Sequence, residues 1–182
     1  GLYAAMVNSR TADLAWQKDY FSWLREHADP ETGLGLAGRH GEAPLAHQLY
    51  GWFHYFFNHE FAHQPIPYPE KLIDSCIDMY KNDQLSPVFG KEVGFMEIDW
   101  IFAMNRASRQ TAHRFDEVKA LLLDHAEKFI AWLDSLDPET DEGLNDLHML
   151  FGAVCAVSEL QLALPGQLCS TVPLKNVLDR RP

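Results

Sequence analysis

Three short segments of the chain share one pattern, and each begins with a polar residue that is capable of chemistry. Each runs polar, any residue, branched aliphatic, aromatic, small, and the starts lie 52 (99 − 47) and 49 (148 − 99) residues apart. A spacing of about 50 residues is typical of an array of similar supersecondary units. The segments are His47-Gln48-Leu49-Tyr50-Gly51, Asp99-Trp100-Ile101-Phe102-Ala103 and His148-Met149-Leu150-Phe151-Gly152.

A polar stripe continues along each of these segments if they are helical. Positions +7 and +11 of a helix lie within about 20° of position 0, on either side of it. A largely apolar helix with one narrow polar stripe indicates burial on most sides and a solvated cleft on the remaining one. The nine stripe positions are all polar or cysteine: His47, His54 and Asn58; Asp99, Arg106 and Gln110; His148, Cys155 and Glu159.

The stripe supplies acids, bases and hydrogen-bonding groups for an organic substrate. If the units pack in order around an axis, His47, Asp99 and His148 come from adjacent helices at one depth. Carboxyl and imidazole groups in such a cleft suit general acid–base chemistry. The candidate catalytic residues are therefore His47, Asp99 and His148, with Glu97 and Asp146 two positions earlier on the same rim. The candidate ligand contacts are His54, Asn58, Trp100, Cys155 and Glu159, and Arg106 as an anion clamp.

Two other interpretations of the stripe remain open. Two histidines and one carboxylate are a known ligand set for Fe(II) and also suit Zn²⁺. Packed helices lie about 8–10 Å apart, however, so one ion would have difficulty reaching both outer helices. The third interpretation is a buried hydrogen-bond network that ties three helices together, because buried polar groups usually satisfy one another. We expect no cofactor.

The segment His59-Glu60-Phe61-Ala62-His63 matches the HExxH signature of zinc proteases. Its context argues against that assignment, since Pro65 follows two residues after the second histidine. Both histidines would also lie about 120–160° around the helix from His47, away from the expected cleft. His59 and His63 are therefore disfavoured as metal ligands, and a zinc-dependent hydrolase is the least favoured function.

The elements that would position the stripe are six helices in three antiparallel hairpins. No segment shows the sustained alternation of a strand, so an all-α single domain over residues 1–182 is expected. Leu2-Tyr3-Ala4-Ala5 matches Leu150-Phe151-Gly152-Ala153, which predicts that the chain begins inside the second helix of an earlier hairpin. The predicted helices are 12–27, 44–63, 69–81, 95–110, 112–135 and 144–163.

Composition limits the classes of partner. The chain has 182 residues and a formal net charge of −11, which disfavours a nucleic-acid or anionic-membrane surface. We find no signal segment and no apolar run of membrane-spanning length. The three cysteines include no close pair, which fits a reducing compartment and a cytoplasmic location.

The chain resembles the α/α toroids in three features: the hairpin period, the small residues inside the second helices, and a pair of similar turns. These turns are Asp29-Pro30-Glu31-Thr32 and Asp137-Pro138-Glu139-Thr140. This group includes six-hairpin glycosidases, related polysaccharide lyases and sugar epimerases, and terpenoid-cyclase-like barrels. The resemblance implies that the second helices line a central cavity whose mouth binds ligands. This chain would supply about half of a six-hairpin ring, completed by an upstream segment or a second copy.

No motif of these families maps residue by residue. The repeat of triterpene cyclases, the zinc ligands of prenyltransferases and an assignable glycosidase carboxylate pair are not found. We therefore expect an uncharacterised toroid protein that acts on or binds a carbohydrate or similar polar small molecule. A non-catalytic helical repeat module that associates with another protein is the alternative. Whether the protein is an enzyme stays open at this stage.

Overall fold

The computed structural model describes residues 2–35 and 43–179, and the regular secondary structure of this part of the chain consists of helices, with no strand. The all-α prediction is confirmed. The predicted helix over residues 69–81 has the observed bounds, and the other five predicted helices agree to within three residues at each end. The helices are α1 (Leu2–Asn8), α2 (Leu14–His27), α3 (Leu45–Phe61), α4 (Pro69–Lys81), α5 (Met96–Ser108), α6 (Phe115–Asp134) and α7 (Leu147–Ala163), with 3-10 turns η1 (Glu142–Asn145) and η2 (Val177–Asp179).

Local chemistry explains where these helices begin. The Asp13 carboxylate accepts a hydrogen bond from the Trp16 amide, which caps α2. The Asp146 carboxylate caps α7 in the same way by accepting the His148 and Met149 amides at 2.8 and 3.0 Å. Helix α4 begins with a proline. Proline is tolerated there because the first N–H groups of a helix have no intrahelical acceptor, so the N–H that proline lacks is not needed. Asp146 is thus a capping residue, which corrects its assignment as a candidate catalytic group.

The two similar turns in the sequence have the same local geometry. The Asp29 carboxylate accepts the Glu31 amide at 2.8 Å, and the Asp137 carboxylate accepts the Glu139 amide at 3.0 Å. Each turn is closed by a further backbone hydrogen bond to the aspartate carbonyl, from Gly33 at 2.8 Å and from Asp141 at 3.0 Å. Aspartate favours such turns because its side chain replaces a backbone acceptor. The sequence repeat is therefore a repeat of structure at these two positions.

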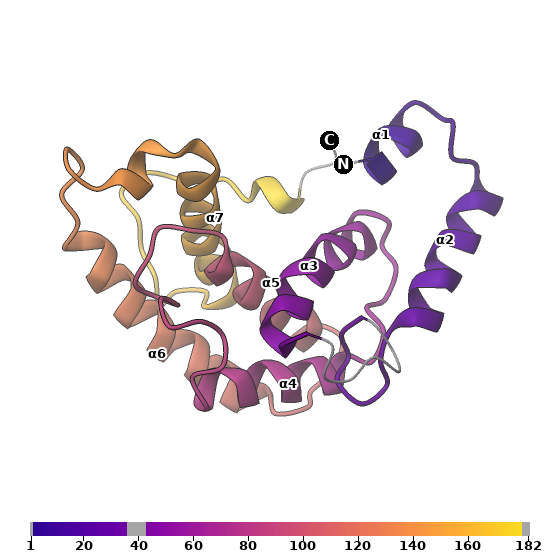
Figure 1. Cartoon of the computed structure of the whole chain (residues 1–182), viewed down its shortest axis with the longest axis horizontal. Helices are drawn as coiled ribbons and strands as arrows, with labels where there is room; N and C mark the ends of the chain where they lie inside the picture. The colour runs from indigo at the N-terminus through magenta and orange to yellow at the C-terminus, as the bar shows by residue number, and fades with distance from the viewer. Residues whose placement is uncertain (1, 36–42, 180–182) are drawn as a thin grey trace.

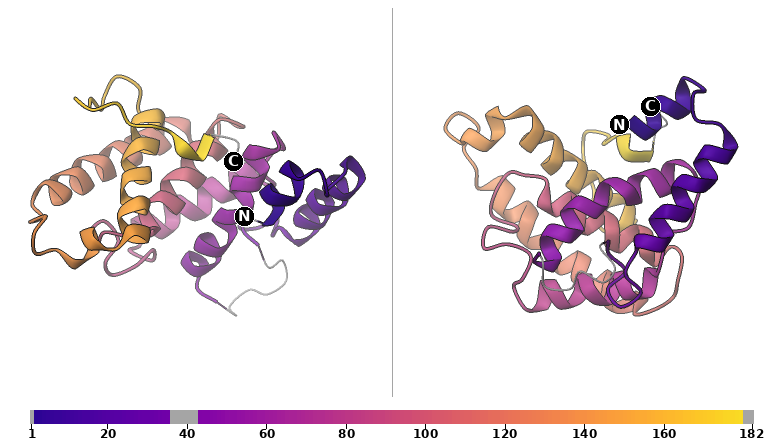
Figure 2. Two further views of the ribbon diagram at one scale, coloured as in Figure 1. Left: turned by 90° about the horizontal axis from the view of Figure 1, so that it is seen from above. Right: turned by 45° about the vertical axis from the view of Figure 1, so that its right-hand side comes forward.

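Helix α5 is the centre of the molecule. All twelve residues from Glu97 to Ser108 are buried, and α5 packs against α3, α4, α6 and α7. Figure 1 shows α2, α4 and α6 along the outer edge of an arc, with α3, α5 and α7 on its inner side. The views in Figure 2 show α1 and α2 at one end of the molecule and α6 with α7 at the other. Eight of the nine polar stripe positions thus lie on the three inner helices, and Gln110 lies just beyond the end of α5.

The small residue that recurs four positions into each stripe segment has different surroundings in α3 and α7. A Cβ atom on Gly152 of α7 would lie 2.5 Å from the Gly94 carbonyl oxygen and 2.9 Å from the Phe95 Cα atom. A Cβ atom on Gly51 of α3 would meet no atom within 4 Å. Gly152 therefore permits close approach of the segment before α5, whereas Gly51 does not serve that purpose.

We expect Gly152→Ala to lower the free energy of unfolding by about 1–3 kcal/mol, because backbone must move to accept the methyl group. The same substitution at the matched position, Gly51→Ala, should raise it by about 0.5–1 kcal/mol through helix propensity. Urea unfolding followed by circular dichroism measures both. Equal effects of the two substitutions would show that the close approach at Gly152 has no energetic role.

Candidate functional site

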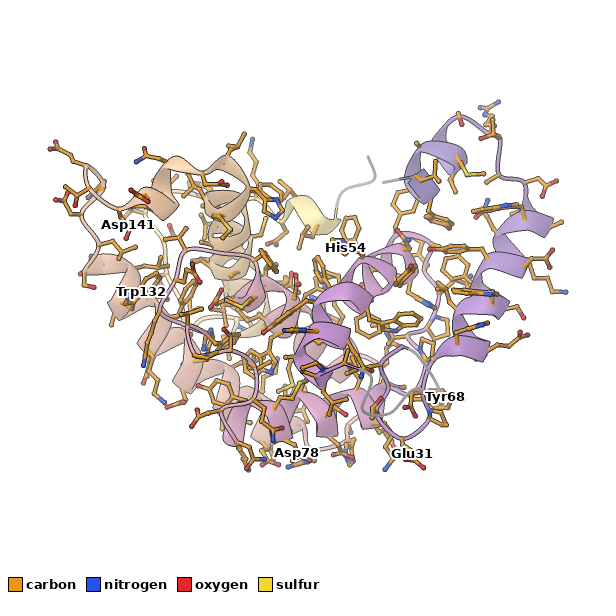
Figure 3. All side chains as sticks on the ribbon, in the orientation of Figure 1. Glu31, His54, Tyr68, Asp78, Trp132 and Asp141 are labelled. Atoms are coloured by element: carbon orange, nitrogen blue, oxygen red, sulfur yellow. The ribbon has the colours of Figure 1, made fainter. Side chains whose placement is uncertain are left out.

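A cleft of about 560 Å³ lies between α3, α5 and α7 and is bordered by η2. Helix α3 supplies one wall, α7 the opposite wall, and α5 with the residue before it supplies the floor. Figure 3 shows His54 on the side of α3 that faces η2. The residues that line the cleft are Tyr50, Phe53, His54, Phe57, Phe95, Ile98, Asp99, His148, Phe151, Gly152, Cys155, Val177 and Leu178.

Four of the nine stripe residues meet in this cleft: His54 from α3, Asp99 from α5, and His148 and Cys155 from α7. They come from three different helices, so the cleft exists only when these helices pack together. The segments containing Asp99 and His148 occupy matching positions in the sequence repeat. His54 occupies the +7 position of its segment, as Cys155 does in α7, whereas His47 at the first position lines the adjoining hollow.

Asp99 is the most unusual group in the cleft. Its side chain is only 3% exposed, and no hydrogen bond or ion pair to its carboxyl is found among the described residues. Burial raises the pKa of Asp99 from 3.8 to about 8, and the nearby charge of Glu97 raises it further in the same direction. A carboxyl with such a pKa can donate or accept a proton near neutral pH. Buried polar groups without a partner are uncommon in proteins.

Aromatic rings form most of the walls. The rings of Tyr50 and Phe95 lie perpendicular at a centroid distance of 6.2 Å, and Phe95 contacts the His148 ring at 5.8 Å. The Phe53 ring meets the His54 ring at 5.4 Å. The Tyr50 hydroxyl donates to the Leu85 carbonyl at 2.9 Å, so it is already committed to the protein. The walls thus offer ring faces and edges but few free hydrogen-bonding groups.

Burial favours the neutral forms of His54 and Cys155 in the cleft. Burial lowers the pKa of His54, which favours its uncharged form. Burial also raises the pKa of the Cys155 thiol to about 11, and the Glu159 charge contributes in the same direction. A thiol with a raised pKa is a poor nucleophile at neutral pH because little thiolate forms. Cys155 is therefore a wall residue rather than a reactive one.

The other candidate catalytic residues do not reach this cleft. His47 is exposed and lines an adjoining hollow, which shares Tyr50 and Phe95 with the cleft. The Glu97 side chain is fully buried and accepts the Gly90 amide at 2.6 Å. Successive residues of a helix point about 100° apart, so the Glu97 side chain, two residues before Asp99, faces a different direction. The shared rim expected for these carboxylates and imidazoles is thus limited to Asp99 and His148.

Trp100 is also placed outside the cleft. Its side chain is fully buried, its indole N–H donates to the Cys76 carbonyl at 3.0 Å, and its ring stacks on Tyr80 at 4.8 Å. These contacts join α5 to α4 in the hydrophobic core. Trp100 therefore stabilises helix packing, which corrects its assignment as a ligand contact.

The deeper stripe residues form a buried polar network. The Arg106 guanidinium binds both oxygens of Glu159 at 2.8 Å and also donates to Glu60 at 3.1 Å. Asn105 donates to Glu159 at 2.6 Å, and Asn58 donates to the Tyr20 hydroxyl at 2.7 Å. Because these groups bind one another, the deeper part of the stripe is a buried hydrogen-bond network that ties helices together. Arg106, Glu159 and Asn58 are structural, which corrects their assignment as ligand contacts.

The HExxH segment does not present a pair of helical histidines. Helix α3 ends at Phe61, and His63 lies beyond it with a φ of 53°. His59 is buried against the Phe21 ring, and burial lowers its pKa to about 4. Glu60 faces Arg106 instead of a metal. Over residues 2–35 and 43–179, no three His, Cys, Asp or Glu side chains are grouped so as to hold a metal ion.

The residues that form the aromatic walls of the cleft and its border at η2 are not among the site residues predicted from the sequence. The α3 wall has a signal, since Tyr50, Phe53 and Phe57 are spaced by three and four residues on the face that also carries His54. Phe95 comes from the irregular segment before α5. Val177 and Leu178 come from the C-terminal segment, whose sequence has no periodicity that predicts its path.

Comparison with protein-family models, with curated proteins and with solved structures found no match. Among the helices of the described residues, none combines the length and the hydropathy needed to cross a membrane. The proposals below therefore depend on the geometry and chemistry of the chain itself.

Proposed function

We propose that this protein binds a small organic molecule in the aromatic cleft, with Asp99 as the group that hydrogen-bonds to the ligand or exchanges a proton with it. The observation that carries this proposal is a buried carboxyl that borders a cavity of about 560 Å³ without a partner among the described residues. Ionisable groups with perturbed pKa values in clefts are concentrated at functional sites.

The lining favours a ligand with a broad apolar face and few polar groups. Tyr50 is committed to a backbone carbonyl, so Asp99, His54 and His148 are the polar side chains left for a ligand. The sequence suggests a carbohydrate or a similar polar small molecule. Such a molecule would suit this lining best if it stacked one face on the rings and directed one polar group to Asp99. A sugar would do so through its apolar face, with its remaining hydroxyls toward the open mouth.

We also propose that the helices belong to an α/α toroid. The alternation of α2, α4 and α6 on the outer side with α3, α5 and α7 on the inner side supports this arrangement (Figure 1). In a toroid the inner helices line the cavity, and the cleft between α3, α5 and α7 would be this chain's share of it. The full ring would then need further hairpins or a second copy.

A neutral fluorescent probe tests the binding proposal. We expect N-phenyl-1-naphthylamine to bind saturably to one site, with an increase in fluorescence as it enters an apolar cleft. Phe151→Ala should weaken binding by about tenfold, because an aromatic wall contact is worth about 1.4 kcal/mol. Val154→Ala is the matched control, because Phe151 and Val154 are both on α7 and are 52% and 48% exposed, yet only Phe151 lines the cleft. Non-saturable binding, or equal losses in both variants, would contradict a site in the cleft.

A further inference from the structure

We propose that the ligand of this cleft is an organic cation, such as a substituted ammonium compound, with the Asp99 carboxylate as its counter-ion. The inference rests on the proposed binding function and specifies the class of ligand. Its basis is the juxtaposition, in one cavity of about 560 Å³, of an aromatic enclosure and a buried carboxyl for which no partner is found among the described residues.

The aromatic enclosure has the composition of a cation site. Five phenyl or phenol rings line the cleft, and they come from both walls and from the segment before α5. The face of an aromatic ring attracts cations through its quadrupole, and enclosures of several rings are used to bind quaternary ammonium groups. The rings are those of Tyr50, Phe53, Phe57, Phe95 and Phe151.

The layer just beneath the cleft already holds a cation in this way. The Arg106 guanidinium carbon lies 4.7 Å from the centroid of the Phe102 ring. Phe102 meets Phe53 edge to face at a centroid distance of 5.3 Å, and Phe53 is a wall of the cleft. The aromatic cluster of α3 and α5 therefore stabilises a positive charge on its buried side, and its open side presents similar ring surfaces.

Among the described residues that line the cleft, none is a lysine or an arginine. The titratable groups that line the cleft with Asp99 or act on its charge are Tyr50 and His54 on α3, Glu97 on its own helix, and His148 and Cys155 on α7. A buried carboxylate without a counter-ion is unfavourable, and a bound cation would supply the missing partner.

Two other classes of ligand fit less well. An anion would find no basic side chain among the described residues that line the cleft. A metal ion needs several oxygen, nitrogen or sulfur ligands in its first shell. No such group of three acidic, histidine or cysteine side chains is present in the described part of the chain. An organic cation needs ring faces and a single carboxylate, which the cleft provides.

Choline and 3,3-dimethyl-1-butanol test the inference, because they have the same shape and differ in the charge of the trimethylated head group. Each is titrated against the protein by calorimetry and by displacement of N-phenyl-1-naphthylamine. We expect choline to bind at least about tenfold more tightly than the alcohol. In Asp99→Asn this preference should disappear, whereas Asp134→Asn, which removes one surface charge at the end of α6, should keep it.

Proton release gives a second readout. Because Asp99 is largely protonated near neutral pH, binding of choline should release about one proton as the carboxyl ionises, whereas binding of the alcohol should release none. Calorimetry in buffers of different ionisation enthalpy measures this number. Release that persists in Asp99→Asn would overturn the role given to this carboxyl.

The possible results separate the two proposals. A preference for choline that depends on Asp99 supports the organic-cation inference. Equal binding of choline and the alcohol, or probe binding that neither compound displaces, overturns the inference and leaves the proposed binding function standing. Absence of binding by the probe and by both compounds overturns the proposed function and the inference together.

Discussion

Glu159→Gln should lower the free energy of unfolding by about 3–5 kcal/mol, a large share of the roughly 5–15 kcal/mol that stabilises a typical domain. The side chains of Arg106 and Glu159 are each only 2% exposed, and two hydrogen bonds of 2.8 Å join them. The amide keeps the shape of the carboxylate but not its charge. The substitution therefore removes one carboxylate charge from the buried Arg106 guanidinium, which keeps Glu60 as an anionic partner at 3.1 Å.

Urea unfolding followed by circular dichroism measures this loss as a lower midpoint at constant slope. Lys128→Gln is the control, because the Lys128–Asp124 pair has side chains that are 68% and 45% exposed. Exposed pairs contribute little, so the control should change stability by less than about 0.5 kcal/mol. A Glu159→Gln variant as stable as the control would mean that this pair is not the link between α5 and α7 that its geometry indicates.

A double variant separates pairing from packing. Replacing both residues, as in Arg106→Met with Glu159→Met, removes both charges at once and should recover part of the loss of the single variant. The reason is that the cost of Glu159→Gln comes mainly from a buried Arg106 charge that has lost its bidentate carboxylate partner. A double variant less stable than Glu159→Gln would instead indicate that the contacts of Arg106 with Phe102 and Glu60 dominate.

The helices could be predicted from the sequence because local signals define them. Apolar spacing of three and four residues gives the helices, and aspartate turns such as those at Asp29 and Asp137 end them. Which stripe residues face a cleft was not predictable. Arg106 and Glu159 occupy polar positions of the same kind as Asp99 and His148, and only the packing of α5 against α7 makes the first two partners of each other.

The cleft also depends on segments without periodicity. Phe95 and Leu178 line it, yet they lie in the segment before α5 and in the C-terminal turn. Their positions follow from tertiary packing, such as the close approach of Gly152 to the Gly94–Phe95 backbone. The sequence therefore indicated a polar face on three helices, but not the aromatic character of the cavity that this face borders.

Asp99→Asn should make the protein more stable at neutral and alkaline pH. Burial raises the pKa of Asp99 in the folded protein from 3.8 to about 8. Between these values the folded state holds a proton that the unfolded state has lost, so stability falls as pH rises, by up to about 1.4 kcal/mol per pH unit. Asparagine is neutral throughout. The variant should therefore match the wild type near pH 4 and exceed its free energy of unfolding by on the order of 4 kcal/mol at pH 8.

Two buried histidines make the shape of the wild-type profile a stricter test. Burial lowers the pKa of His59 and His125 from 6.5 to about 4, so over that interval the unfolded state binds more protons and stability rises with pH. Below about pH 6.5, the histidines increase stability with rising pH and oppose the decrease caused by Asp99. Above about pH 6.5, the decrease caused by Asp99 remains. Urea unfolding from pH 4 to 9 should show the wild type losing stability between pH 6.5 and 8 while Asp99→Asn stays nearly constant. Parallel profiles over that interval would mean that the Asp99 carboxyl is already ionised and paired in the folded protein, and the cleft would then lack the free acid on which its proposed chemistry depends.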